Sequence, residues 1–348
     1  MQTPKKPSRR DRGGRNGPTI HDVARVAEVS IGTASKALNG AGRLRSETRE
    51  KVVRAAREIG YRPNDLAQSL HRARSMTVGL ITNDSFGRFS FPIVEALEEK
   101  LAGLGIAVFM CNATDDPERE RQHLEQLMRK RIDGLVVTAR RADKRPPIGP
   151  IAADIPVVYV YSQTDDPDAL CLIPDDEGGA RLAVSHLASL GRKRIAHLAG
   201  PERFDAVRLR QRGYVDALSA AGLTYESSIS LSGPWSEQWG RDAVAALYDR
   251  GGHRPDALFC DNDQIARGAA EALRERGVSI PGEVAIVGFD NWEVMTSAAR
   301  PPLSSIDMNL QTLGREAGEC LIAIMRGETL RGTRRLPCSL VVRESSKP

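Results

Sequence analysis

The sequence predicts an N-terminal all-α domain containing a helix-turn-helix, followed by an α/β core built from two doubly wound parallel-sheet lobes. Residues 18–62 show apolar residues at helical spacing, with helix caps between them. From Met76 onward, short apolar runs alternate with amphipathic helical patterns, which is typical of parallel sheets. The charge changes at the same place. Residues 1–72 hold 16 Lys and Arg against 7 Asp and Glu, whereas the rest of the chain holds 34 against 38.

Three short helices are expected in residues 18–62. Each follows a residue type that caps helix N-termini, namely Thr19, Ser30 and Ser46. The second helix ends at Asn39-Gly40, a left-handed stop signal, and the third ends at Gly60. Two short helices three residues apart, with a supporting third, form the helix-turn-helix pattern. The alternative is a small bundle that only packs, and the positive charge of this region argues against it.

The core is expected to repeat one β-α plan twice. In the first half the pattern predicts strands at 76–82, 106–111, 134–138 and 157–160, and helices at 91–104 and 117–130. In the second half it predicts helices at 177–190, 209–220, 238–248 and 263–276, and strands at 194–199, 257–260 and 284–288. Two similar α/β halves resemble the layout of periplasmic binding proteins, with a ligand cleft between the lobes.

Composition argues against several other classes of protein. The five cysteines of this 348-residue chain are odd in number and widely spaced, which favours reduced thiols over disulfides or a metal site. The basic N-terminus precedes no apolar run, and no stretch reaches the ~20 apolar residues of a membrane helix. We therefore expect a cytoplasmic protein. Nucleotide-binding glycine motifs, GxSxG and HExxH are absent from the sequence, so an enzyme on this fold is a weaker alternative.

Several runs of residues resemble the lactose-repressor (LacI/GalR) family of transcriptional regulators. In the N-terminal region these are Thr19–Ser30, Thr33–Asn39, Thr48-Arg49 and Tyr61–Asn64, with Ala67 and Leu70. The core adds Asp175-Asp176, Gly178–Ala180, Gly200-Pro201, Arg208–Tyr214, Asn262-Asp263 and Val287–Asp290. The resemblance covers about residues 18–345. It implies a dimeric repressor that binds a pseudo-palindromic operator in double-stranded DNA and needs no cofactor, catalytic residue or metal.

The second helix of a helix-turn-helix enters the major groove of DNA with its early residues at the base edges. Ile31, Gly32, Thr33 and Lys36 are the positions expected to be exposed, and Lys36 can donate to guanine O6 and N7. Hydroxyl side chains nearby are better placed for phosphates. The predicted DNA-binding set is Thr19, Ser30, Ile31, Gly32, Thr33, Ser35, Lys36, Asn39, Asn64, Ala67 and Leu70. Glu28 departs from the family pattern, which has glycine in this turn, and a left-handed Glu costs about 1 kcal/mol.

Residues 63–74 are expected to form a hinge. The run from Asn64 to Leu70 is long enough for about two helical turns, which are marginal alone in water. The resemblance implies that this helix folds when two subunits meet on DNA, and that Ala67 and Leu70 enter the minor groove. An ordinary linker helix with Leu70 in a core is the alternative. Residues 1–17 are expected to be a disordered basic arm, either attracted to DNA or simply solvated.

Candidate effector-binding residues follow from where strands end, because ligands of open α/β sheets lie beyond the carboxyl ends of strands. Asn83, Tyr161, Asn262 and Asp290 each follow a predicted strand. Arg210 matches the effector-contacting arginine of the family, and Trp235 is placed where an aromatic ring can lie against a sugar. Phe89 and Met308 complete the set. Alone, each could serve as a cap or an ion-pair partner, but together they favour a site for a sugar or glycoside.

The expected organisation is an arm at 1–17, a helix-turn-helix domain at 18–62, the hinge at 63–74, and a core at 75–348. Lobe 1 takes about 75–174 and 306–337, and lobe 2 takes about 175–303 and 338–348. A polar tail without a leucine heptad predicts a dimer and no tetramerising coiled coil. The chain is thus expected to be a cytoplasmic, nucleoid-associated repressor controlled by a small-molecule effector. A freestanding periplasmic sugar-binding protein is the other alternative, and the basic N-terminal domain opposes it.

Overall fold

The computed structural model describes residues 17–39, 42–61, 74–149, 152, 154–249 and 254–347. The chain divides into two units, Met1–Ser75 and Met76–Pro348, and each is described by itself. Within the described residues, no helix is both long and apolar enough to cross a membrane. The predicted fold class, a helical N-terminal region followed by a two-lobed α/β core, is confirmed.

The described residues of the first unit contain three helices, α1 (Ile20–Val26), α2 (Ile31–Leu38) and α3 (Ser46–Glu58). Small apolar residues from all three form one core: Val23, Ala24, Ala27, Ala34, Ala37, Val52, Ala55 and Ala56. Glu28, in the turn between α1 and α2, has a left-handed backbone with a φ of 51°. Its carboxylate forms an ion pair with Lys51 of α3 at 2.8 Å, so this side chain ties the turn to the supporting helix.

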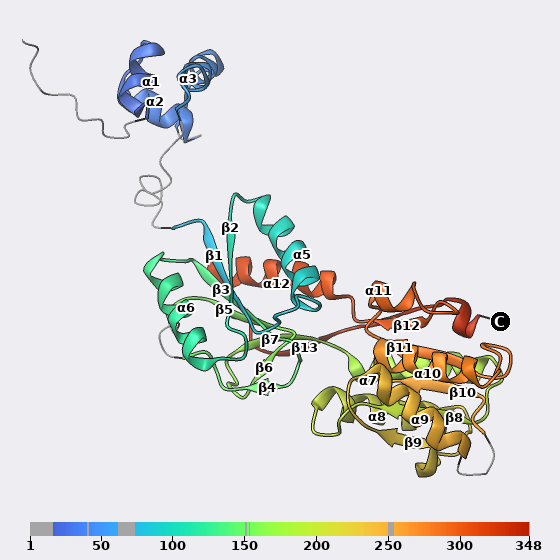
Figure 1. The fold of residues 1–348 in the computed structure, drawn as a ribbon. Coiled ribbons are helices and arrows are strands. Elements are labelled where there is room, and N and C mark those ends of the chain that lie inside the picture. Colours follow the sequence, from blue (N-terminus) through green and yellow to red (C-terminus); the bar gives the residue numbers. More distant parts are fainter. Residues whose placement is uncertain are drawn as a thin grey trace, which may run out of the picture. The chain divides into compact units, whose positions relative to one another are not determined.

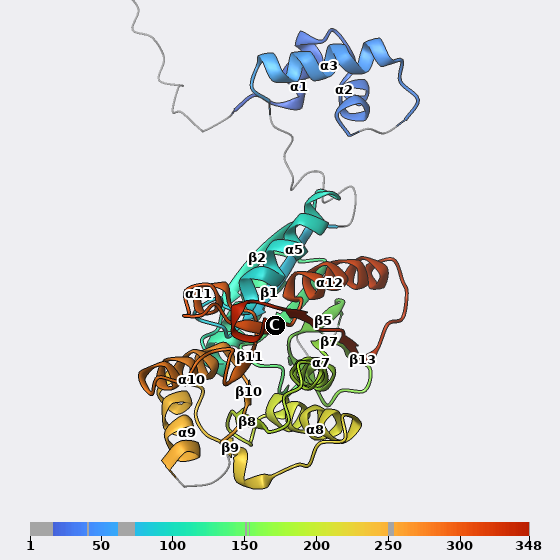
Figure 2. The same ribbon diagram turned by 90° about the vertical axis from the view of Figure 1, so that its right-hand side faces the viewer.

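Lobe 1 of the second unit is built on a sheet in the order β13-β7-β5-β3-β1-β2. Its strands are β1 (Thr77–Thr82), β2 (Ala107–Asn112), β3 (Gly134–Thr138), β5 (Val157–Val160), β7 (Leu170–Pro174) and β13 (Gly332–Leu336), all parallel. Helices α5 (Ser90–Ala102) and α12 (Leu310–Met325) pack side by side on one face (Figures 1 and 2). Helix α6 (Pro117–Arg129) buries Leu124 and Leu127 on the other face. A two-stranded sheet joins β4 (Lys144–Arg145) to β6 (Gln163–Thr164).

Lobe 2 is a second sheet, in the order β14-β12-β11-β10-β8-β9. Its strands are β8 (Ile195–Ala199), β9 (Ser230–Ser232), β10 (Ala257–Cys260), β11 (Ala285–Phe289), β12 (Ser304–Asp307) and β14 (Ser339–Val341). Only β14 runs antiparallel to its neighbour. Helices α7 (Asp176–Ser189) and α8 (Asp205–Ala220) cover one face, and α9 (Glu237–Asp249) and α10 (Asp263–Glu275) cover the other (Figure 1). A short helix, α11 (Glu293–Thr296), and two 3-10 turns, η2 (Ser227–Ile229) and η3 (Glu344–Ser346), complete the lobe.

Helix α12 is absent from the elements that the sequence pattern indicates. It contains Gly314 and Gly318, and each glycine lowers helix propensity by about 1 kcal/mol relative to alanine. Packing explains Gly314, because a Cβ at this position would lie 2.2 Å from the backbone oxygen of Ile93 in α5. The glycine that weakens the local signal therefore allows α5 and α12 to approach closely.

The chain passes between the two sheets three times, after β7, after β12 and between β13 and β14. Strand β12 ends at Asp307 and belongs to the second sheet. The chain thus returns to lobe 1 slightly later than the expected position of about 306. These three connections bring the carboxyl ends of strands from both sheets to one cleft.

Candidate functional site

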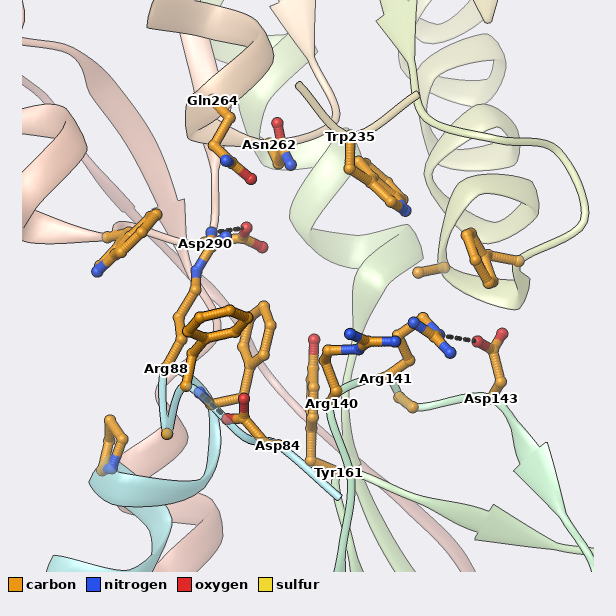
Figure 3. Close-up of a pocket in the computed structure, with 18 of the residues that line it drawn as sticks. Asp84, Arg88, Arg140, Arg141, Asp143, Tyr161, Trp235, Asn262, Gln264 and Asp290 are labelled. Carbon is orange, nitrogen blue, oxygen red and sulfur yellow. Dashed lines mark hydrogen bonds and ion pairs between the residues drawn. The ribbon is translucent and has the colours of Figure 1, made fainter. Parts of the chain in front are cut away.

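A cavity of about 970 Å³ lies between the two lobes (Figure 3). Its lining comes from the segments that follow β1, β3 and β5 in lobe 1 and β8, β9, β10 and β11 in lobe 2. The lining residues are Asp84, Phe86, Gly87, Arg88, Phe89, Phe91, Pro92, Arg140, Arg141, Ala142, Asp143, Tyr161, Arg203, Phe204, Ala206, Arg210, Trp235, Asn262, Gln264, Asp290 and Trp292. The cavity is therefore a strand-end site of the kind that binds ligands in open α/β sheets.

Two lining residues follow their strands directly and have left-handed backbones. Tyr161, after β5, has a φ of 53°, and Asp290, after β11, has a φ of 99°. A non-glycine residue in this region costs about 1–3 kcal/mol, and such residues cluster at functional sites. The turn at Asp290 is fixed by its own backbone N–H, which donates to Ile306 O of β12 at 2.8 Å. The strand end thus holds the Asp290 carboxylate in a set position at the cavity wall.

Asp290 lies between two arginines from different lobes. Arg88, in the loop before α5, donates to Asp290 Oδ2, and the Arg210 guanidinium lies 3.9 Å from Oδ1. Arg210 Nη2 also pairs with Asp176 Oδ1 at 2.7 Å, with only 3 % of the Arg210 residue exposed. Burial raises the pKa of the Asp290 carboxyl, although both arginines oppose that effect. For Arg210, burial acts to lower the pKa, but the surrounding carboxylates outweigh it and raise the pKa above its usual value.

A second buried carboxyl, Asp263, lies behind Asp290 at the start of α10. Its Oδ1 accepts from Ser305 Oγ and its Oδ2 accepts from the backbone N–H of Trp292, both at 2.6 Å. Burial and then the nearby Asp290 charge raise the pKa of Asp263 to about 8. The raised pKa favours the protonated form of Asp263, and its two hydrogen bonds anchor the segment after β11 to α10.

Aromatic rings form much of the cavity wall. Seven of the sixteen aromatic residues of the chain line it: Phe86, Phe89, Phe91, Tyr161, Phe204, Trp235 and Trp292. The rings of Phe89 and Tyr161 are stacked at 5.0 Å, and Phe204 and Trp235 lie at 6.2 Å between centroids. Figure 3 shows the Trp235 ring projecting from lobe 2 above Arg140 and Arg141 of lobe 1. Flat apolar faces beside charged groups suit a ligand with a ring and several polar substituents.

The two lobes touch at both sides of the cavity. On one side, the Arg88 guanidinium stacks on Trp292 at 4.3 Å as well as pairing with Asp290. On the other, Asp143 Oδ1 of lobe 1 accepts from the backbone N–H of Asp205 in lobe 2 at 2.8 Å. The ligand-facing side chains of both lobes therefore lie around one shared space.

Six of the eight residues predicted from the sequence line this cavity: Phe89, Tyr161, Arg210, Trp235, Asn262 and Asp290. Asn83 and Met308 do not. Asn83 hydrogen-bonds instead to Asp115 and to the backbone N–H of Arg140, so it supports the loop that carries Arg140. Met308 is fully buried in the main hydrophobic core. The side chain of Asn262 also caps α10, accepting from the Ile265 N–H at 2.8 Å.

Sequence reasoning missed several charged and aromatic lining residues. They are Asp84, Arg88, Arg140, Arg141, Asp143, Arg203, Phe204, Gln264 and Trp292. Each lies within six residues of the end of β1, β3, β8, β10 or β11. A search over a longer window after each strand could have found them.

In the first unit, the residues predicted to meet DNA lie on and around α2. Ile31, Gly32 and Lys36 are exposed, as predicted, whereas Thr33 is half-buried and Ala34 and Ala37 of the same helix are buried. Ser30 Oγ accepts from the Thr33 N–H at 3.1 Å and caps α2. Asn39 Nδ2 donates to Ser35 Oγ at 3.2 Å. Thr19 is exposed at the start of α1, and Asn64, Ala67 and Leu70 lie outside the described residues.

No group of three or more His, Cys, Asp or Glu side chains arranged to hold a metal ion is found in the part of the chain that the structure describes. The carboxylates of the cavity are instead used by arginines and backbone N–H groups.

Family models match both units of the chain. Residues 19–64 match the model of bacterial regulatory proteins of the lacI family. Residues 75–343 match the model of periplasmic binding proteins and the sugar binding domain of the LacI family.

Individual proteins match over nearly the whole chain. The HTH-type transcriptional regulator DegA of Bacillus subtilis (strain 168) is 30% identical over 339 residues, covering 95% of this chain and 98% of that protein. Among solved structures, the Lac repressor dimer bound to operator and the anti-inducer ONPF is 29% identical with a TM-score of 0.76, covering 95% of this chain and 99% of that one. A complex of the transcriptional regulator CelR with cellobiose is 30% identical with a TM-score of 0.66, covering 94% and 99%.

Proposed function

Because the chain belongs to the LacI family of bacterial regulatory proteins, we propose that it is a repressor whose operator affinity is controlled by a sugar or glycoside bound between the lobes of its core. The family consists of DNA-binding transcriptional regulators and not of enzymes. The core is a ligand-binding domain of the periplasmic-binding-protein type. The identity of the effector as a carbohydrate goes beyond family membership and rests on the cavity.

One observation carries the carbohydrate assignment: the cavity combines aromatic faces with a paired carboxylate and guanidinium at its wall. Asp290 can accept from sugar hydroxyls while Arg88 and Arg210 donate to them, so vicinal hydroxyls would keep their hydrogen bonds on burial. The Trp235 ring offers an apolar face for the C–H groups of a sugar ring. CelR, which has a similar fold, binds cellobiose. A volume of about 970 Å³ is at the upper end of the range for small-molecule sites, which favours a glycoside over a free monosaccharide.

The first unit would supply operator recognition. Its exposed α2 positions Ile31 and Lys36 would face base edges in the major groove, while the capping hydroxyls would meet phosphates. Two subunits related by a two-fold axis require two half-sites, as in the operator-bound Lac repressor dimer. Residues 63–74 would act as the hinge, with Ala67 and Leu70 in the minor groove, and the basic residues 1–17 would add sequence-independent attraction. A regulator of this kind acts in the cytoplasm, at the nucleoid.

Control would follow from the hinge, which joins the operator-binding first unit to the effector-binding core. An effector that binds one arrangement of the lobes better than another shifts the population of hinge conformations, and hence the affinity for operator. The residues that hold the lobes together at the cavity, Arg88 with Asp290 and Asp143 with Asp205, are those that a ligand would have to accommodate.

The test has two parts and uses the full-length protein. In the first, a gel-shift selection from random duplexes should return a pseudo-palindrome. In the second, a thermal-shift screen of sugars and glycosides should find a ligand that also changes affinity for the selected duplex. Failure to select any sequence would refute the repressor assignment. Selection of an operator without a response to any carbohydrate would refute only the effector assignment.

A further inference from the structure

We infer that the effector is an acidic carbohydrate, whose carboxylate or phosphate group is held by Arg140, Arg141 and Arg203. The inference rests on the proposed function, because it specifies the ligand of the same cavity. It follows from the charges of the lining, from guanidinium N–H groups that protein carboxylates do not take up, and from the rings that position these arginines.

The cavity lining carries more positive than negative charge. Five arginines and three aspartates line it. All three carboxylates already have protein partners. Asp84 accepts from the backbone N–H groups of Phe89 and Ser90, Asp143 accepts from the Asp205 N–H, and Asp290 is paired with Arg88. Arg210 is neutralised by Asp176, and Arg140 and Arg141 each have one carboxylate partner, Asp115 and Asp143. Among the described residues, Arg203 is thus the lining arginine without a carboxylate partner, whereas Arg140 and Arg141 each keep further guanidinium N–H groups.

These three guanidinium groups have donors to spare. Arg140 Nε is buried and has no hydrogen-bond partner among the described residues, although Nη2 of the same side chain reaches Asp115 at 3.2 Å. Arg141 Nε lies 3.5 Å from Asp143 Oδ2, longer than a good charge-assisted hydrogen bond. Arg203 has no ion pair with any carboxylate in the described part of the chain. A ligand group with several acceptor oxygens would satisfy these donors, and a carboxylate or phosphate has them on one atom.

Aromatic stacking holds two of these arginines at one place. The Phe204 ring has Arg203 at 4.4 Å and Arg141 at 4.9 Å from its centroid, and it also packs against Trp235. A guanidinium stacked on a ring keeps its N–H groups at its edge, where they can bind an anion in a bidentate manner. Lobe 1 supplies Arg141 and lobe 2 supplies Arg203, so an anion between them would join the lobes.

The rest of the cavity argues for a carbohydrate that carries the anion, and against a simple anion. The volume of about 970 Å³ is far larger than a carboxylate or phosphate needs. Figure 3 shows Arg140 and Arg141 on one side of the cavity and the Arg88–Asp290 pair on the other. A ring could therefore lie near Trp235, with its hydroxyls toward Asp290 and its acidic group toward the arginines.

Matched ligands test the inference directly. Titration calorimetry on the full-length protein would compare neutral sugars with their uronates and their 6-phosphates, both as monosaccharides and as disaccharides, at fixed pH. We expect an acidic member to bind at least about tenfold more tightly than its neutral parent, the value of one charge-assisted hydrogen bond. Its affinity should also fall as salt rises. A response confined to uronates would assign a carboxylate, and one confined to 6-phosphates would assign a phosphate.

Substitutions locate the acidic subsite. Arg140→Gln and Arg141→Gln each keep a polar side chain and remove one charge, so both should lower affinity for the acidic sugar while operator binding stays unchanged. Arg331→Gln is the matched control, because Arg331 is exposed and pairs with Asp168 outside the cavity. Equal or tighter binding of the neutral parents would overturn this inference and leave the carbohydrate proposal standing. Binding of no carbohydrate at all, by a protein that still selects an operator, would overturn both.

Discussion

The Arg88 guanidinium donates a hydrogen bond to Asp290 Oδ2, although the two residues are 202 positions apart in the chain. Arg88 comes from lobe 1 and Asp290 from lobe 2, so the pair joins the two lobes at one side of the cavity. Only 14% of the Arg88 side chain and 7% of the Asp290 side chain are exposed, so water screens the pair weakly. A ligand that enters the cavity must replace this contact or build on it.

Asp290→Asn should give a protein that binds operator normally and responds poorly to effector. The substitution keeps the shape of the side chain but removes the negative charge. The carboxylate pairs with Arg88 and would accept hydrogen bonds from ligand hydroxyls. We expect a loss of about 2–5 kcal/mol in effector binding, measured by titration calorimetry with the best ligand of the thermal screen. Asp216→Asn, at an exposed position of α8 outside the cavity, is the control. Undiminished affinity in Asp290→Asn would move the effector site elsewhere.

Arg210→Ala should reduce stability as well as effector binding. Arg210 neutralises the buried Asp176 and stacks on the Phe289 ring at 3.6 Å. Its loss would leave a buried carboxylate unpaired, and the free energy of unfolding should fall by about 3–5 kcal/mol. Urea titration followed by circular dichroism measures this, with Arg212→Ala as the control, since Arg212 is exposed and pairs with Glu177 at 3.3 Å. Equal unfolding midpoints for the two variants would show that Arg210 has no structural role.

The raised pKa of Asp263 predicts that the free energy of unfolding depends on pH. Its pKa of about 8 in the folded protein lies above the ordinary value of 3.8, so between these limits the folded protein keeps a proton that the unfolded chain releases. Its contribution to the free energy of unfolding should therefore decline as pH rises from about 4 to about 8, by at most about 1.4 kcal/mol per pH unit. Asp263→Asn mimics the protonated form and should remove this decline. Urea unfolding of both proteins over that range checks it, and parallel curves would contradict it.

Lys36→Ala should relax base preference at one position of each half-site. Lys36 is exposed on α2, and the base contact it is expected to make is worth about 1–3 kcal/mol. Selection from random duplexes, with wild type and variant compared, measures the change. Lys51→Ala on α3 should weaken binding, if at all, to a similar extent for all sequences. An unchanged selected sequence and affinity in Lys36→Ala would show that Lys36 does not read a base.

Leu70→Ala should weaken operator binding and reduce the bend in the DNA, while leaving the dimer and the effector affinity intact. An apolar side chain that enters the minor groove unstacks a base step, and alanine is too short to do so. A phased-bending assay on the selected operator measures the bend. The hinge assignment fails if wild type and variant bend DNA equally.

The strand-end rule located much of the site from sequence, because the strands are short apolar runs whose last residue is easily recognised. Tyr161 and Asp290 directly follow β5 and β11, and both line the cavity. The rule locates the end of a strand but not the direction in which the next side chain points. It therefore also selected Asn83, whose side chain hydrogen-bonds to Asp115. The rule missed Arg88, because Arg88 lies in a loop without periodicity and its partner Asp290 is in the other lobe. The sequence pattern also missed helix α12, for a different reason. Its glycines allow close packing against α5, and they lower its helix propensity.

The arrangement of β13 and β14 has a consequence for synthesis of the protein. Residues 332–341 supply an edge strand to the sheet of lobe 1 and then one to the sheet of lobe 2. Domains generally fold as units while the chain emerges from the ribosome, N-terminal first. Here neither lobe has its full sheet until this late segment has emerged, so the two lobes reach completion together. Translation arrested before residue 332 would leave the edges of β7 and β12 uncovered in the same nascent chain, where they could pair with another chain.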